Sequence, residues 1–133
     1  CNINFSRPLL HQAKALGKTV ATDVHVLSDI HDEFNREFMA CADILFLSDE
    51  GIPGDYRDFL RALGDAYGNR IIVLGRGAKG AAMYLREEGR MFALPAVQVG
   101  KIVNTVGAGD ALFSGFLHYF VQGYRPPDAL TRA

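Results

Sequence analysis

Asp43-Ile44-Leu45-Phe46-Leu47 is an unbroken apolar run that begins at an acidic residue and is followed by Ser48-Asp49-Glu50. A strand buried on both faces, as in the middle of a parallel sheet, has this pattern instead of alternating polar and apolar residues. A second run of the same kind extends from Arg70 to Leu74. Between the two runs, Pro53 and Gly68-Asn69 bracket a segment that predicts a helix. The stretch therefore predicts a strand–helix–strand unit with parallel strands.

The same criteria extend the pattern toward both ends of the chain. Helices are predicted from Ser6 to Leu16 and from Asp32 to Ala42, with a short strand from Lys18 to Val24 between them. The later predicted segments are a hairpin of strands at Ala81 to Leu85 and Arg90 to Leu94, an extended piece at Gln98 to Thr105, and helices at Asp110 to Gln122 and after Pro126-Pro127. This order predicts an α/β fold with a largely parallel sheet flanked by helices.

The predicted helix from Asp110 to Gln122 differs from the others because it is apolar on almost every side. Seven of its residues are large and apolar or aromatic: Leu112, Phe113, Phe116, Leu117, Tyr119, Phe120 and Val121. A helix of this kind is expected to be buried in the middle of a protein.

Length and composition exclude several classes of protein. The 133 residues suffice for one domain but not for two. The 14 basic and 15 acidic residues give a net charge of −1, so no basic field is available for nucleic acid or an anionic membrane surface. The longest apolar stretch, Ala111 to Val121, is too short to span a membrane. No secretion signal opens the chain, which predicts a cytoplasmic protein.

The cysteines and the chain ends add two expectations. Cys1 and Cys41 are 40 positions apart, a spacing that indicates reduced thiols and neither a disulfide framework nor a metal site. The chain begins with Cys1 instead of Met and stops inside an expected helix. We therefore expect all 133 residues to be part of a longer polypeptide.

Two glycine-containing segments follow predicted strands and have open interpretations. Gly75-Arg76-Gly77-Ala78-Lys79-Gly80 matches G-x-G-x-x-G, but a hairpin follows it and no acidic residue lies between Gly89 and Gly109, which excludes a dinucleotide-binding motif. Ala81-Ala82 after Gly80 excludes a P-loop. The segment is either a ligand-binding turn at the carboxyl end of a strand or only a tight turn. Ser48-Asp49-Glu50 before Gly51 is either a solvated loop or a set of ligands for hydrated magnesium.

The third segment, Gly107-Ala108-Gly109-Asp110, gives the sharpest prediction of a site. Small residues let the backbone approach a ligand, and the following helix presents unpaired N–H groups and a positive dipole end. These features predict an anion site. Asp110 is then either a helix cap or a base that takes a proton from a hydroxyl group attacking phosphorus.

The longer stretch from Asn104 to Phe116 closely resembles the second signature of the ribokinase-like sugar kinases, also called the phosphofructokinase B family. Residues 42–50 resemble the strand of that family that ends in an Asn-x-x-Glu element, and residues 71–81 resemble its nucleotide-side glycine turn. The resemblance covers essentially the whole chain but only the carboxyl-terminal part of a family member. It implies a ribokinase-like partial domain that lacks the lid.

The resemblance also implies a role for each matching residue. Asp110 would be the base on the acceptor hydroxyl, and the backbone amides of Gly107, Ala108 and Gly109 would form the anion hole. The implied contacts with ATP are Gly75, Gly77, Gly80, Ser48 and Thr105, of which Thr105 also lies where some members bind a monovalent cation. Because Ser48-Asp49-Glu50-Gly51 replaces Asn-x-x-Glu, Mg²⁺ would use Glu50 or Asp49 out of register. Asn104 stands where the signature has an aspartate, which weakens any cation or structural role of that carboxylate.

The implied function is ATP-dependent phosphorylation of a hydroxyl group on a small sugar-like acceptor. Two alternatives stay open: a nucleoside kinase of the same family, and a non-catalytic nucleotide-binding or regulatory relative. An NAD-dependent oxidoreductase is disfavoured by the missing ribose-binding acid. The expected partners are a sugar or nucleoside, with no nucleic acid and no membrane, and a homodimer is compatible with the resemblance.

Overall fold

The computed structural model describes residues 4–97, 100 and 104–133. In chain order, the elements are η1 (Asn4–Ser6), α1 (Arg7–Ala15), β1 (Ala21–Val26), α2 (Arg36–Cys41), β2 (Ile44–Ser48), α3 (Tyr56–Tyr67), β3 (Ile71–Gly75), η2 (Gly77–Lys79), β4 (Ala81–Leu85), β5 (Arg90–Leu94), α4 (Ala108–Val121) and α5 (Pro126–Arg132). The predicted α/β class is confirmed. Most of the segment predicted to be extended at Gln98 to Thr105 lies outside the described residues, as does Cys1.

The five strands form one mixed sheet in the order β1-β2-β3-β4-β5. The first three strands are parallel, with Ile44 of β2 opposite both Ala21 of β1 and Ile71 of β3. The β4–β5 hairpin is antiparallel to β3 and has the predicted bounds. Because β1, β2 and β3 run in the same direction, their carboxyl ends meet at one edge of the sheet.

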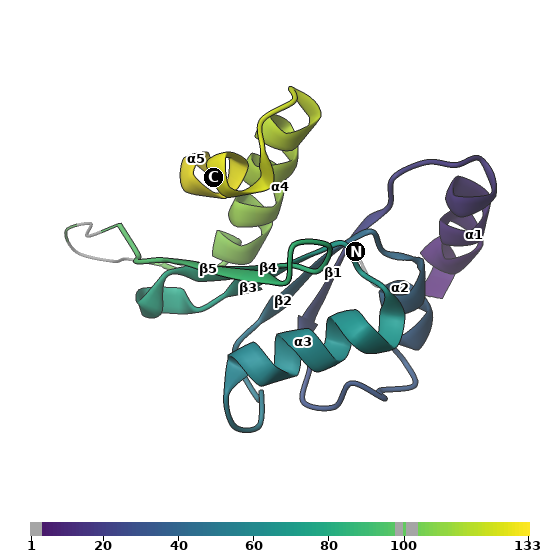
Figure 1. Cartoon of the computed structure of the whole chain (residues 1–133), viewed down its shortest axis with the longest axis horizontal. Helices are drawn as coiled ribbons and strands as arrows, with labels where there is room; N and C mark the ends of the chain where they lie inside the picture. Colours follow the sequence, from purple (N-terminus) through teal and green to yellow (C-terminus); the bar gives the residue numbers. More distant parts are fainter. Residues whose placement is uncertain (1–3, 98–99, 101–103) are drawn as a thin grey trace.

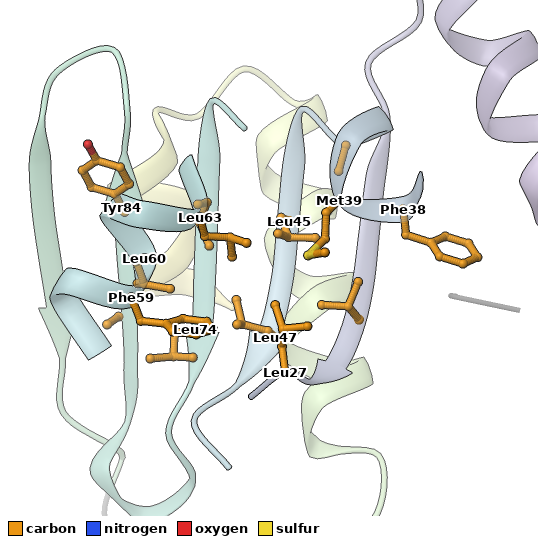
Figure 2. Close-up of a cluster of buried hydrophobic side chains, with 14 residues drawn as sticks. Leu27, Phe38, Met39, Leu45, Leu47, Phe59, Leu60, Leu63, Leu74 and Tyr84 are labelled. Atoms are coloured by element: carbon orange, nitrogen blue, oxygen red, sulfur yellow. The ribbon is translucent and has the colours of Figure 1, made fainter. Parts of the chain in front are cut away.

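Alternating side chains of the buried strands divide the core into two layers. Leu45 and Leu47 of β2 point to the face covered by α2 and α3, where they pack with Leu60 and Leu63 (Figure 2). Phe46, on the opposite face, packs with the α4 residue Phe116. Figure 1 shows α4 and α5 on one side of the sheet and α2 and α3 on the other. The apolar runs of β2 and β3 therefore reflect strands that are covered on both faces.

The starts of three elements differ from the prediction because tertiary and capping contacts decide them. β1 begins at Ala21, three residues later than predicted, because Ala21 pairs with the first residue of β2. α3 begins at Tyr56 and not at Pro53, since the Asp55 carboxylate caps it by accepting a hydrogen bond from the Arg57 N–H at 2.7 Å. α2 begins at Arg36, so Phe34 precedes the helix and is 48% exposed.

The prediction that α4 is buried in the middle of a protein is not met within the described residues. Phe116 is the only α4 residue in the buried class, and Val121 is 79% exposed. The helix has only two covering neighbours among the described residues, the sheet and α5. Its remaining apolar surface is therefore open to solvent.

Two further features concern the cysteine thiol and the length of the helices. Cys41 is a free, buried thiol, and burial raises its pKa against the opposing effect of Lys14. No helix within the described residues is long and apolar enough to cross a membrane.

Candidate functional site

A cavity of about 510 Å³ lies where the carboxyl ends of β1, β2 and β3 meet the N-terminal end of α4. Open α/β sheets bind ligands at this edge because the loops that follow parallel strands converge there. Eight of the ten residues predicted to form the site line the cavity: Ser48, Glu50, Gly75, Gly77, Gly80, Thr105, Ala108 and Gly109. The other two, Gly107 and Asp110, are exposed and do not line it.

The backbone before α4 turns sharply at Gly107, which has a φ of 80°. Asn104 begins this turn by accepting a hydrogen bond from the Val106 N–H through its side chain at 2.9 Å, and the Ala108 N–H donates to the Thr105 carbonyl at 3.1 Å. The N–H groups of Gly109 and Asp110 have no backbone acceptor among the described residues. Two amides at a positive helix end are thus open to an anion, whereas the predicted Ala108 amide is already engaged.

Asp110 lies in the first turn of α4 and does not cap the helix. The capping position belongs to Gly107, and no side chain makes a capping hydrogen bond there. Within the described residues, the Asp110 carboxylate makes no hydrogen bond or ion pair. The exposed carboxylate lies outside the lining of the cavity.

The loop after β2 brings oxygen atoms to the cavity. Asp49, Glu50 and Ser48 all line it, and the Glu50 N–H donates to the Ser48 hydroxyl at 3.3 Å. The Asp49 N–H donates to the Gly75 carbonyl at 2.9 Å, which links the ends of β2 and β3. No cluster of three or more His, Cys, Asp or Glu side chains that could hold a metal is found among the described residues.

The glycine turn after β3 is closed by its own backbone. The Arg76 N–H donates to the Gly80 carbonyl at 2.9 Å, and the Gly80 N–H donates to the Gly77 carbonyl at 3.0 Å. Gly80 has a φ of 91°, and a Cβ atom at this position would lie 2.0 Å from the Leu94 carbonyl oxygen. The turn therefore requires glycine at Gly80 for its own geometry, in addition to any contact with a ligand.

Asp23 and His25, at the end of β1, line the cavity but were not predicted from the sequence. The Asp23 carboxylate accepts a hydrogen bond from the His25 N–H at 2.8 Å, and the register with β2 shifts between Asp23 and Val26. His25 has a φ of 60° and is the only non-glycine residue with positive φ among those described. Such strain is typical of functional sites. The sequence feature that could have indicated these two residues is a pair of polar side chains toward the carboxyl end of a parallel strand.

Comparisons with known proteins show the family and the fold of the chain. A family model described as pfkB family carbohydrate kinase matches residues 4–133. The acarbose 7(IV)-phosphotransferase of Actinoplanes sp. is 32% identical over 113 residues, which cover 84% of this chain and 37% of the relative.

Solved structures share the fold. A microbiome-derived acarbose kinase has a TM-score of 0.87 at 22% identity, over 98% of this chain and 44% of that chain. Aminoimidazole riboside kinase from Salmonella enterica, solved with aminoimidazole riboside and an ATP analog, has a TM-score of 0.78 at 25% identity, over 95% of this chain and 46% of that chain. The chain therefore spans less than half the length of these relatives.

Proposed function

This chain belongs to the pfkB family of carbohydrate kinases, as the resemblance of residues 104–116 indicated, and we propose that its cavity binds the phosphates of ATP. The proposed reaction is transfer of a phosphoryl group from ATP to a hydroxyl group of a small sugar-like or nucleoside acceptor. The relatives described above are kinases and a phosphotransferase, and one of them was solved with an ATP analog.

The convergence of eight residues from separate segments on one cavity is the observation that carries this proposal. These residues come from the ends of β2 and β3 and from the start of α4, and they line one cavity of about 510 Å³. Pockets of roughly 300–1,000 Å³ are typical of small-molecule sites. The open N–H groups of Gly109 and Asp110 supply the donors that a phosphate requires.

We assign the Asp110 carboxylate the role of the base that accepts the proton of the attacking hydroxyl group. Within the described residues the carboxylate makes no capping bond or ion pair, which supports this role because no such contact competes for its oxygen atoms. The open backbone amides of Gly109 and Asp110, at the positive end of α4, would stabilise the charge on the transferred phosphoryl group.

Magnesium fits the site only as an ion shared with the nucleotide. Mg²⁺ in phosphoryl-transfer sites takes one or two carboxylates from the protein and its other ligands from phosphates and water. Asp49 and Glu50 match this modest donor set, whereas no larger cluster is present among the described residues. When bound there, Mg²⁺ would neutralise charge on the phosphates.

A Gly109→Ala variant tests the phosphate site with little risk to folding. A Cβ atom at Gly109 meets nothing within 4 Å, and alanine is favoured over glycine in a helix by about 0.5–1 kcal/mol. The variant should therefore unfold at the same or a slightly higher temperature. Its methyl group occupies the approach to the open amides, so its Kd for ADP should rise about tenfold, the effect of losing one charge-assisted hydrogen bond.

The control for this measurement is Ser114→Ala, an exposed residue on the same helix that does not line the cavity. Titration calorimetry with ADP and a thermal melt should be performed on the same samples. Equal Kd values for wild type, Gly109→Ala and Ser114→Ala would contradict the proposed site.

Asp110→Asn tests the proposed chemistry in a kinase of the relatives' full length that carries this chain. Loss of a general base typically lowers kcat by about 10²–10⁴-fold. ADP affinity should change little, and stability should fall by about 0.3–1 kcal/mol because a favourable charge at the helix N-terminus is lost. Steady-state kinetics give the answer. A kcat near that of wild type would contradict the role of Asp110 as the base, whereas a wild-type kinase without turnover would favour the non-catalytic, nucleotide-binding alternative.

A further inference from the structure

A second cavity, of about 350 Å³, adjoins the first and is rich in basic side chains. Arg57 at the start of α3, together with Arg76 and Lys79 of the glycine turn, contributes three positive charges to its lining. Asp49 and Asp55 contribute two carboxylates. Arg76 and Asp49 also line the first cavity, so the two cavities share a wall.

The Arg76 side chain lies in this wall, and within the described residues it makes no hydrogen bond or ion pair that would account for its position. Its guanidinium carbon lies 4.3 Å from the centre of the Tyr56 ring, a stacking distance for a cation on an aromatic face. Its Nε atom is buried and has no hydrogen-bond partner among the described residues. Leaving such a donor unpaired costs about 1–3 kcal/mol, so a buried unpaired donor beside a cavity calls for an acceptor.

The other two basic residues are held only loosely by the carboxylates. The Arg57 Nη1 atom lies 3.5 Å from Asp55 Oδ2, and Lys79 Nζ lies 3.4 Å from Asp49 Oδ2. The Arg57 and Lys79 side chains are 51% and 70% exposed. Exposed ion pairs of this kind contribute little to stability, so both side chains are free to turn toward an incoming anion. With two basic residues paired, the unmatched charge in the second cavity is that of Arg76.

We propose that the second cavity is a phosphate-binding site in which Arg76 is the main ligand and Arg57 and Lys79 complete the positive charge. The planar guanidinium presents its N–H donors in a geometry that suits phosphate oxygens. The phosphate belongs either to a nucleotide in the first cavity, reaching across the shared wall, or to a separate phosphate-bearing molecule. The site goes beyond the proposed function, which depends on Gly109 and Asp110 and not on Arg76.

The test is a titration of the ¹⁵N-labelled chain with inorganic phosphate, followed through the arginine Nε–Hε signals in NMR spectra. The Arg76 signal, assigned by its loss in Arg76→Gln, should shift and saturate, whereas sodium chloride at matched ionic strength should leave it in place. Arg76→Gln should raise the Kd for phosphate at least tenfold. Arg61→Gln, which removes an exposed arginine of α3 paired with Asp58 outside both cavities, should leave the Kd unchanged.

The same spectra identify the source of the phosphate. If inorganic phosphate and ADP compete for the Arg76 signal, the nucleotide's own phosphates occupy the site; if both bind together, a separate molecule does. An Arg76 signal that does not move with phosphate, or that moves equally with chloride, overturns the proposal. If Arg76→Gln proves unfolded in a thermal melt, Lys79→Gln replaces it and should raise the Kd at least threefold. Failure of the ADP site would appear separately, as unchanged amide signals at Gly109.

Discussion

At the scale of single residues, the fold requires glycine at some positions of the candidate site but not at others. Gly80 has positive φ and is packed against the backbone after β5, so its lack of a side chain is a requirement of the fold. Gly109 has neither constraint, because a Cβ atom there would meet nothing within 4 Å. Gly107 has a φ of 80° but open surroundings. A glycine that the fold does not require is the better candidate for contact with a ligand.

Gly80→Ala should therefore destabilise the chain strongly. Gly80 has φ 91° and ψ −134°, a backbone conformation that is nearly restricted to glycine and costs an alanine about 1–3 kcal/mol. In addition, the 2.0 Å approach of the alanine Cβ to the Leu94 carbonyl forces the β4–β5 hairpin to shift. We expect a loss of more than about 3 kcal/mol in the free energy of unfolding, measured by urea denaturation. Gly75→Ala, whose Cβ would meet only ordinary contacts at 3.8 and 3.9 Å, is the control. Equal urea midpoints for the two variants would show that the turn does not have this geometry.

At the scale of elements, Asp43 connects a helix and two strands at the edge of the sheet opposite the site. Its carboxylate accepts hydrogen bonds from the Val20 N–H at 2.8 Å and from Lys14 of α1 at 2.9 Å. Its backbone carbonyl accepts hydrogen bonds from Arg70 and Ile71, at the start of β3. Burial acts to raise the pKa of Asp43, but these hydrogen bonds and the charge of Lys14 outweigh burial and lower the pKa below 3.8.

The sign of this shift predicts how stability depends on pH. A carboxyl group whose pKa is lowered by folding stabilises the folded state above its unfolded pKa, and this contribution is lost as pH falls through the folded pKa. Asp43→Asn should therefore destabilise the chain by about 1–2 kcal/mol at pH 7, since hydrogen bonds to a charged group are replaced by neutral ones. The difference from wild type should stay constant down to about pH 5 and shrink below about pH 4.

The matched control is Asp58→Asn, which removes a carboxylate that is 80% exposed and pairs with Arg61 on the surface of α3. This variant should have a stability within about 0.5 kcal/mol of wild type at every pH. Urea denaturation at a series of pH values measures both variants. A difference between Asp43→Asn and wild type that does not change from pH 7 to pH 3 would refute the role assigned to the Asp43 carboxylate.

At the scale of the whole molecule, the chain forms a five-stranded sheet but leaves apolar surfaces open. Val121 on α4 is 79% exposed, and Phe5 and Leu16 beside α1 are 76% and 72% exposed. The chain spans 37% of the acarbose phosphotransferase and 44% of the acarbose kinase that it resembles. The candidate nucleotide site lies within this portion, whereas Asp110 lies outside the lining of its cavity.

We therefore expect the 133-residue chain to bind ADP but not to phosphorylate a sugar. Positioning of the acceptor supplies much of the rate enhancement in phosphoryl transfer, and this chain spans less than half the length of the relatives that phosphorylate one. The test is an assay of ADP release with a panel of sugars and nucleosides, and we expect no turnover. A thermal melt of the same samples shows that the chain is folded. Acceptor-dependent turnover at about 1–100 s⁻¹, the range of intact kinases, would contradict this prediction.

Patterns that depend on neighbouring residues could be interpreted from the sequence alone. The apolar runs of β2 and β3, the β4–β5 hairpin and the glycine-rich start of α4 were predicted with nearly the observed bounds, because backbone conformation and local burial determine such patterns. The family was also evident from residues 104–116, since their order and spacing are specific.

Tertiary structure decided what depends on residues distant in the chain. β1 begins where β2 offers a pairing partner, and α4 is half exposed because only the sheet and α5 cover it. Asp23 and His25 reach the cavity only through the parallel arrangement of β1 and β2, and the requirement for glycine at Gly80 comes from the backbone after β5. Arg76 became a candidate ligand only because the fold places it on the Tyr56 ring and in the lining of both cavities. Local sequence encodes the conformation of a segment, whereas contacts between segments exist only once the chain has folded.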